Sequence, residues 1–264
     1  MIRMISEEEA AAFAFSNDAE AITFYKMRQL LHAENALRLS DGKDLLLVRA
    51  GRGWPAWIYS RRGVSDEALT ELAASLCVLK EAKNLDGVIG RAALVRYLEL
   101  ALPYPKARRL PLTAYLCGEP NRFAAEGERV PAKDLDPAVC GALLAQLSVQ
   151  AREPIPEAEI PAAGQRFCES DGSYGWCING TTVALVRITD ESERLAYINS
   201  AVTDAAYRGH GYAKALVSSV CADAFARGRR IMLYADTSYP PSNALYRAVG
   251  FAEAGRLLGF DFSD

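Results

Sequence analysis

Apolar residues recur along this chain with two periods, one typical of helices and the other typical of strands. The β-rich runs 174–178 and 181–188 flank Asn179-Gly180, and this dipeptide predicts a tight hairpin because both residues tolerate positive φ. Apolar residues gather on one side of 212–227, which predicts a helix, and Gly228 is expected to end it. The second half of the chain therefore mixes strands and helices.

The remaining segments of the second half extend this mixture. We expect, in chain order, a short strand at 129–132, a helix capped by Asp134 or Asp136, a loop over the Pro-rich stretch 154–161, strands at 195–203 and 231–235, a short helix at 242–249 and a final strand pair within 251–262. This order predicts a mixed α/β domain.

The first half has a similar order of elements. Ser6 and Glu9 have the spacing of a capping box, so a helix should begin at about residue 7. The other expected elements are a helix over 20–39, a hairpin formed by 43–49 and 54–59, a helix over 65–82 with Ser65 as its N-cap, a helix over 92–102 and a strand over 110–117. At 264 residues the chain is long enough for two domains, which we place at 1–126 and 127–264.

Composition and charge narrow the class of protein. Thirty Lys and Arg against 33 Asp and Glu give a net charge of −3, so no global positive field would hold nucleic acid or anionic lipid. Glu7, Glu8 and Glu9 stand where a signal peptide would need an apolar stretch, and no window approaches 18 uncharged apolar residues. We expect a cytoplasmic protein that does not bind a membrane.

Metal chemistry is not expected from this sequence. The six cysteines form no Cys-x-x-Cys pair, and His32 and His210 are the two histidines, so the spacing of a zinc site is missing. The cysteines are expected to be buried free thiols in a reducing compartment.

The segment between the strand at 195–203 and the helix at 212–227 is the most informative one. Gly209 and Gly211 stand at the helix start, where glycines let backbone amides approach a ligand and the helix adds partial positive charge. The segment suits a phosphate or pyrophosphate, although a tight turn would be favoured for an isolated Gly-x-Gly. Neither Gly-x-Gly-x-x-Gly nor a P-loop pattern is present, which argues against the nucleotide folds.

Two motifs together resemble the GNAT family of N-acetyltransferases. Arg208-Gly-His-Gly-Tyr-Ala213 is similar to the acyl-CoA motif [Q/R]-x-x-G-x-[G/A], and Asn243-Ala-Leu-Tyr-Arg-Ala-Val-Gly-Phe251 is similar to the family's later segment. The resemblance covers roughly 127–264 and is nearest to a bacterial subgroup of acetyltransferases with an additional amino-terminal domain. It implies a mixed-sheet GNAT fold in the C-terminal half. The N-terminal half would be a degenerate GNAT-like α/β domain, because it lacks the glycine motif.

The resemblance also implies roles at the matching positions. Main-chain groups of Ala201, Val202 and Thr203 would pair with the pantetheine arm of the cofactor, and the amide of Val202 would hold the oxyanion. Asn243 would bind the pantetheine, and the Tyr246 hydroxyl would protonate the leaving thiolate. The pyrophosphate would be held by the amides of Arg208, Gly209, His210, Gly211, Tyr212 and Ala213.

The general base is the weakest part of the match. Many GNAT enzymes carry a Glu on the strand that corresponds to 195–203, but this segment contains no carboxylate. Asp236 and Glu193 are the nearest acidic residues, and for both a structural role is favoured over a catalytic one. A proton path relayed by water remains open. For Arg227 to Arg230 we favour solvated charge near a helix end over contact with the 3′-phosphate of CoA.

These observations favour one activity and leave two alternatives. We expect an N-acetyltransferase that moves an acetyl group from acetyl-CoA, its co-substrate, to a primary amine by direct attack and without a metal. The acceptor would be an amine-bearing small molecule or a protein amine. A non-catalytic acyl-CoA binding or sensing module is the alternative, motivated by the missing carboxylate, and an interaction scaffold without CoA affinity is a third reading. Acceptor identity, acyl preference and oligomeric state are left open.

Overall fold

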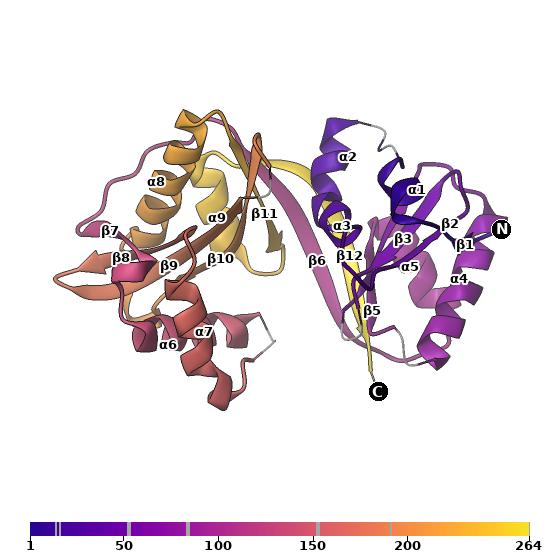
Figure 1. Ribbon diagram of the computed structural model, residues 1–264, viewed down its shortest axis with the longest axis horizontal. Helices are drawn as coiled ribbons and strands as arrows, with labels where there is room; N and C mark the ends of the chain where they lie inside the picture. Colours follow the sequence, from indigo (N-terminus) through magenta and orange to yellow (C-terminus); the bar gives the residue numbers. More distant parts are fainter. Residues whose placement is uncertain are drawn as a thin grey trace. The chain divides into compact units, whose positions relative to one another are not determined.

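A computed structural model describes residues 1–13, 15, 17–51, 54–82, 85–151, 154–190 and 192–263 (Figure 1). The chain divides into two compact units that alternate along the sequence. Unit 1 comprises Met1–Ala114, Asp236–Ser238 and Glu253–Asp264, and unit 2 comprises Tyr115–Ala235 and Tyr239–Ala252. The contiguous division expected from the sequence, 1–126 and 127–264, stays a prediction.

Unit 1 has strands in the order β1-β2-β3-β4-β5-β12. Its elements are β1 (Arg3–Met4), α1 (Glu7–Ala11), α2 (Asp18–Thr23), α3 (Tyr25–Leu30), β2 (Leu37–Ser40), β3 (Leu45–Arg49), β4 (Ala56–Ser60), α4 (Asp66–Glu81), β5 (Gly87–Gly90), α5 (Ala92–Ala101), the first part of β6 (Lys106–Cys117) and nearly all of β12 (Ala252–Phe262). The capping box at Ser6 and Glu9, the hairpin of β3 and β4 and the cap at Ser65 are confirmed.

Two expectations for unit 1 and its final strand were wrong. The helix expected over 20–39 is divided at Phe24, and its last residues form β2, in which Leu39 pairs with Leu47 of β3. Residues 251–262, expected as a strand pair, form the single strand β12, whose Phe260 pairs with Val88 of β5. In both cases pairing with another strand decides the local structure, and that strand is the adjacent β3 for β2 and the distant β5 for β12.

Unit 2 has strands in the order β11-β10-β9-β8-β7. Its elements are the end of β6, β7 (Glu128–Pro131), η1 (Ala132–Asp134), α6 (Pro137–Gln150), η2 (Glu157–Glu159), α7 (Ile160–Cys168), β8 (Ser173–Ile178), β9 (Thr181–Asp190), β10 (Leu195–Thr203), η3 (Ala205–Tyr207), α8 (Tyr212–Ala226), β11 (Arg230–Asp236, except its last residue) and α9 (Pro240–Val249). Asp136 caps α6. The hairpin between β8 and β9 is confirmed, with Asn179 at φ 48° and Gly180 at φ 79°.

The helix α7 was missed, because its first two residues were read as the end of a Pro-rich loop and no element was expected over the rest. Pro161 stands in the first turn of α7, where a helix loses nothing from the missing amide hydrogen. Prolines at this position begin a helix, so the expected loop at 154–161 is confined to the residues before it.

Apolar side chains of unit 2 form two cores on opposite faces of its sheet. The first lies under α8 and α9 and includes Val186, Val217 and Tyr246. The second lies under α6 and α7 and includes Leu143, Leu185 and Val202. Figure 1 shows α8 on one side of β9 and β10, and α6 and α7 on the other.

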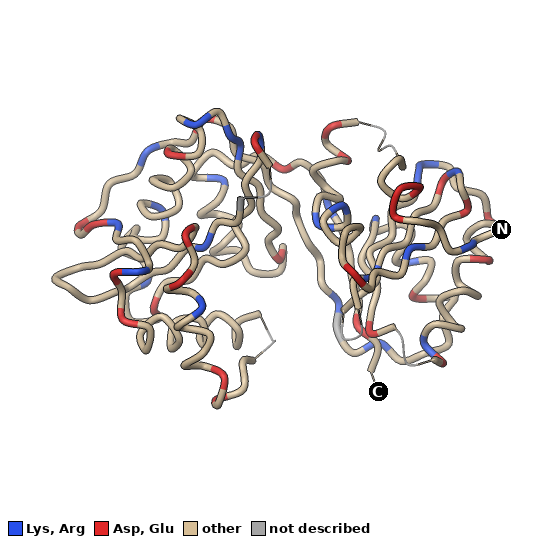
Figure 2. Tube along the Cα trace, in the orientation of Figure 1, with Lys and Arg blue, Asp and Glu red and all other residues tan. Residues whose placement is uncertain are grey.

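Charged residues are interspersed over both units rather than gathered by sign (Figure 2). This distribution is in keeping with the small net charge of −3. Within the part of the chain that the structure describes, no helix is long and apolar enough to cross a membrane.

Candidate active site at the end of strand β10

Strand β10 leaves one of its edges open near its carboxyl end. It pairs with β9 from Ala196 to Thr203, but with β11 it pairs over Leu195–Tyr197. Beyond Tyr197 the main-chain groups on the β11 side are therefore available to an added strand or an extended ligand. A register shift between Ile198 and Ser200 lies where this pairing stops.

The alternation of the antiparallel ladder decides which residues face the open edge. The amide of Asp204 donates a 2.9 Å hydrogen bond to the carbonyl of Val183 on β9. Since main-chain groups of successive residues point to opposite sides, Val202 is directed toward its partner Leu185 on β9, and Ala201 and Thr203 are directed toward the open edge. The amide of Val202 thus faces away from the edge at which the oxyanion was expected.

The loop after β10 contains two glycines in the left-handed conformation. Gly209 has φ 85° and Gly211 has φ 87°, a region that other L-residues rarely adopt. A Cβ built at either position meets no atom within 4 Å. Conformation, and not crowding, therefore requires glycine here, and the space above the loop is open.

The side chains of Arg208 and His210 hold this loop in place. The Arg208 Nε donates to the carbonyl of Thr203 at 3.3 Å, which confirms that this carbonyl points away from β9. The His210 Nδ1 donates to the carbonyl of Arg208 at 2.9 Å, and the His210 ring stacks on Tyr212 with centroids 5.6 Å apart. Because both atoms near Nδ1 are carbonyl oxygens, that nitrogen carries a proton.

Helix α8 begins directly after the loop and gives it electrostatic character. Gly211 is the N-cap, no acidic residue stands in the first turn, and the helix runs for 15 residues. Free amides at such a start, together with the helix dipole, favour an anion by about 0.3–1 kcal/mol at the surface. The loop and the start of α8 bring together the six residues expected to hold a pyrophosphate, 208–213.

Asn243 lies inside unit 2 with its amide already bonded. The side chain is 3% exposed, its Oδ1 accepts from the Tyr115 hydroxyl at 3.0 Å, and its Nδ2 donates to the carbonyl of Tyr239 at 2.8 Å. The Nδ2 bond joins the first turn of α9 to the residue before it. These two internal bonds give the side chain a structural role. The bond to pantetheine expected from the sequence stays a prediction.

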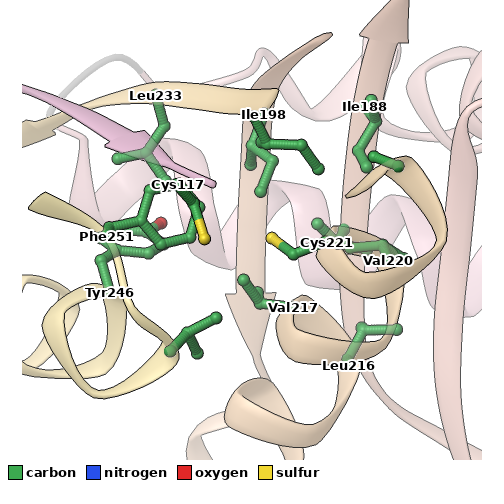
Figure 3. Packing of buried hydrophobic residues seen from close by; sticks show 14 of the residues in the cluster. Cys117, Ile188, Ile198, Leu216, Val217, Val220, Cys221, Leu233, Tyr246 and Phe251 are labelled. Atoms are coloured by element: carbon green, nitrogen blue, oxygen red, sulfur yellow. The ribbon is translucent and has the colours of Figure 1, made fainter. Parts of the chain in front are cut away.

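Tyr246 is one helical turn from Asn243 and packs in the core under α8 and α9 (Figure 3). Its ring contacts those of Tyr115 and Phe251, with centroids 6.2 and 5.6 Å away. Burial raises the pKa of its hydroxyl well above the usual value, with smaller contributions from Tyr197 and Cys221. The phenol therefore stays protonated at neutral pH, as a proton donor must.

The acidic candidates have other surroundings. Asp236 accepts hydrogen bonds at Oδ1 from the amide and the hydroxyl of Ser238, at 2.7 and 2.6 Å, and so it shapes the turn after β11. Glu193 is exposed in the turn before β10. Arg227 follows the far end of α8, about 22 Å from Gly211 along a helix of this length, so a 3′-phosphate contact by this patch is not supported.

Two cavities of unit 2 lie away from the loop. One of about 750 Å³ is bounded by the β8–β9 hairpin and the start of α6, including Asp134, Val139 and Thr181. The other, of about 380 Å³, includes Tyr174 and Asp223. Among residues with described placement, no group of three or more His, Cys, Asp or Glu side chains could hold a metal.

Sequence reasoning missed residues that support the site from other elements. Gln146 on α6 accepts from the amide of Ala205 at 3.2 Å and so holds the turn η3 that leads into the loop. Tyr115 on β6 orients Asn243. Neither residue belongs to a motif, and their partners lie 59 and 128 positions away, so no local signal points to them.

Comparison with known proteins agrees with this geometry. Residues 142–251 match the profile of the acetyltransferase (GNAT) family. No curated protein matches the sequence.

Solved structures match over the whole chain at low identity. A GCN5-related N-acetyltransferase from Sphaerobacter thermophilus has a TM-score of 0.62 and 16% identity, with 99% of this chain and 94% of the other covered. A GNAT acetyltransferase from Colwellia psychrerythraea gives 0.59 and 14%, with 100% of both chains covered. A tandem GNAT protein from the clavulanic acid biosynthesis pathway gives 0.56 and 13%, with 100% and 99% covered.

At these identities the structural likeness shows the fold alone, and the mixed α/β GNAT fold expected from the sequence is confirmed. The profile match contains β10, the glycine loop, α8 and α9, which are the elements of the candidate site. Residues 142–251 are therefore similar in sequence to the GNAT acetyltransferase family.

Proposed function

We propose that unit 2 transfers an acetyl group from acetyl-CoA to a primary amine by direct attack of the amine on the thioester. The family match supports the coarser activity, acyl transfer from an acyl-CoA to an amine. The observation that carries the proposal is the loop 208–213, in which two left-handed glycines lead into α8 directly after the open edge of β10.

The main chain of β10 would bind the pantetheine arm and polarise the thioester. Ala201 and Thr203 direct their amides and carbonyls to the open edge, although Arg208 already binds the carbonyl of Thr203. We therefore assign the oxyanion to an amide of Ala201 or Thr203, in place of the Val202 amide, and keep Val202 as a residue that packs under α6. The amides of residues 208–213 would hold the pyrophosphate.

Tyr246 would supply the proton to the leaving thiolate. Its raised pKa keeps the hydroxyl protonated over the range in which a thiol with a pKa of about 8.5 changes charge. Asn243, one turn before it, would serve by fixing the start of α9 through its bonds to Tyr115 and Tyr239.

A non-catalytic acyl-CoA binding module is the second candidate. Two observations favour it: β10 carries no carboxylate, and Asp236 accepts a hydrogen bond from Ser238. A water-relayed proton path would remove this objection, because the amine then needs no dedicated base.

Two measurements test the proposal. Excess CoA should raise the melting temperature, since a ligand at about 100 times its dissociation constant stabilises by about 2.7 kcal/mol, and NAD and ATP should raise it less. Thiol release from acetyl-CoA in the presence of an amine panel then separates the candidates. A shift without turnover supports the binding module, and the lack of any shift contradicts both.

A further inference from the structure

A row of polar residues crosses the sheet of unit 2 on the face that α6 and α7 cover. Arg187 on β9 pairs with Ser173 of β8 on one side and with Ser200 of β10 on the other. Residues directly opposite in a sheet share a face, so the three side chains form one row. We call Ser173, Arg187 and Ser200 the Arg187 row.

The neighbouring row identifies this face. Two residues earlier on β9, Leu185 pairs with Gly175 and Val202, and Leu185 and Val202 belong to the core under α6 and α7. Side chains two residues apart on a strand point to the same side. The Arg187 row therefore lies on the α6 and α7 face, about 7 Å along the strand from Val202.

Two polar atoms of the row are buried without a hydrogen-bond partner. Ser173 is 1% exposed, and neither its Oγ nor the Nε of the half-buried Arg187 has a partner. Within the described part of the chain no carboxylate forms an ion pair with Arg187. Each unsatisfied buried polar atom lowers the stability of the folded state by about 1–3 kcal/mol. Two such atoms side by side on one sheet therefore indicate a site for a bound ligand that supplies their hydrogen-bond partners.

The side chains of the Arg187 row have the chemistry of an anion-binding site. A guanidinium offers only donors and binds planar anions through two parallel hydrogen bonds, and a serine hydroxyl can donate a further one. The pyrophosphate loop lies beyond Thr203, whose partner on β9 is Ala184, three residues before Arg187. An anion at the row is thus separate from the phosphates that residues 208–213 would hold, and it lies beside the strand segment that would hold the thioester.

We infer that the Arg187 row binds the carboxylate of the acceptor, so the acceptor is an amine that carries a carboxylate close to its amino group, as a free amino acid does. This inference rests on the proposed function and names its substrate class. With the carboxylate held by Arg187 and Ser173, the amine of a small amino acid lies toward the β10 segment at Ala201 to Thr203, where the thioester carbonyl would stand.

The test compares each acceptor with its own uncharged analogue. Wild-type protein is supplied with acetyl-CoA and a panel of L-amino acids and the matching L-amino acid amides, and thiol release is measured. At least one amino acid should exceed its amide by about 10- to 100-fold in kcat/KM, the range expected from a hydrogen bond to a charged group. Equal rates for acids and amides would overturn the inference while the proposed function stands.

Three variants assign the preference to the row. Arg187→Gln should reduce the preference for the acid to near unity, and Arg187→Lys should keep part of it because the charge remains. Arg194→Gln, which removes an exposed arginine from the turn before β10, should leave the preference for the acid over the amide unchanged. Because no carboxylate among the described residues balances Arg187, Arg187→Gln should melt no lower than wild type, and this verifies that the variant is folded.

A binding measurement keeps the inference testable without turnover. The CoA-induced shift in melting temperature should be the same in Arg187→Gln as in wild type, and a lost shift would show that Arg187 binds CoA instead. If wild type acetylates no amine, the proposed function fails. The inference is then tested by adding an amino acid together with CoA, which should raise the melting temperature of wild type but not that of Arg187→Gln. If the two proteins respond alike, the inference is overturned.

Discussion

The hydroxyl of Tyr115 donates a 3.0 Å hydrogen bond to Oδ1 of Asn243, which lies 128 positions later in the chain. Both residues are buried, and both belong to unit 2. The bond joins the end of β6 to the first turn of α9, the helix that carries Tyr246. The position of the proposed proton donor thus depends on a residue far outside its motif.

Tyr115→Phe should lower the free energy of unfolding by about 1 kcal/mol, because it removes one buried hydrogen bond and little volume. Chemical denaturation followed by circular dichroism measures this change. Tyr207→Phe is the control, since Tyr207 is 36% exposed and its loss of a hydroxyl should have little effect. Equal stabilities of wild type and Tyr115→Phe would contradict the role given to this bond.

Gly211→Ala should abolish most of the CoA-induced shift in melting temperature, since alanine disfavours φ 87° and the amides around it would turn away from a common point. Gly228→Ala is a matched control. Gly228 also has a positive φ, 74°, and also has open space where a Cβ would stand, but it follows the other end of α8. Both variants should lose stability, and only Gly211→Ala should lose the response to CoA.

His210→Ala should weaken CoA binding only a few-fold and leave kcat close to wild type. The ring holds the loop through the Arg208 carbonyl and through stacking on Tyr212, and an exposed hydrogen bond contributes about 0.5–1.5 kcal/mol. Isothermal titration with CoA and steady-state kinetics measure the two quantities. Loss of turnover with binding intact would identify His210 as a catalytic residue, against our assignment.

Tyr246→Phe should lower kcat by about 10²- to 10⁴-fold, the usual contribution of a general acid, with a smaller effect on KM. The ring contacts with Tyr115 and Phe251 should survive, so CoA should still raise the melting temperature. A variant that turns over at the wild-type rate would reduce Tyr246 to a packing residue and leave the binding site unchanged.

Tyr246 also predicts how stability depends on alkaline pH. Its pKa is raised in the folded state above the value of about 10 in unfolded chains, so the folded state holds the proton more tightly. This contribution is fully present below pH 10 and is lost as the pH rises toward the folded pKa. Urea midpoints measured from pH 9 to 11 should fall less steeply for Tyr246→Phe than for wild type, and parallel curves would contradict the burial of the hydroxyl.

Sequence patterns predict the elements of this chain wherever local residues decide the structure. The Asn179-Gly180 turn, the strand at 195–203 and the helix starting at Tyr212 follow from turn chemistry and apolar spacing, and the structure confirms them. The strand β2 and the course of β12 were not predictable, because each is fixed by a partner strand that sequence spacing does not reveal.

The features of the candidate site also fall into those that a local motif predicts and those that depend on strand pairing. The glycine loop is a local motif, and its backbone has the conformation that the motif requires. The direction of the Val202 amide depends on the ladder with β9, and the Arg187 row depends on the register of three strands, with a shift near Ile198. Such relationships arise only when the strands have been paired, and so they are beyond what a single sequence can indicate.

The pairing of β12 with β5 bears on how the chain folds as it is synthesised. Val88 and Ile89 of β5 meet their partners on β12 only at Phe260 and Gly259, about 170 residues later. Until those residues emerge from the ribosome, one edge of β5 has no strand beside it and could pair with another nascent chain. All residues of unit 2 precede that point. Nascent-chain proteolysis should therefore find unit 2 protected first, even though unit 1 begins the sequence.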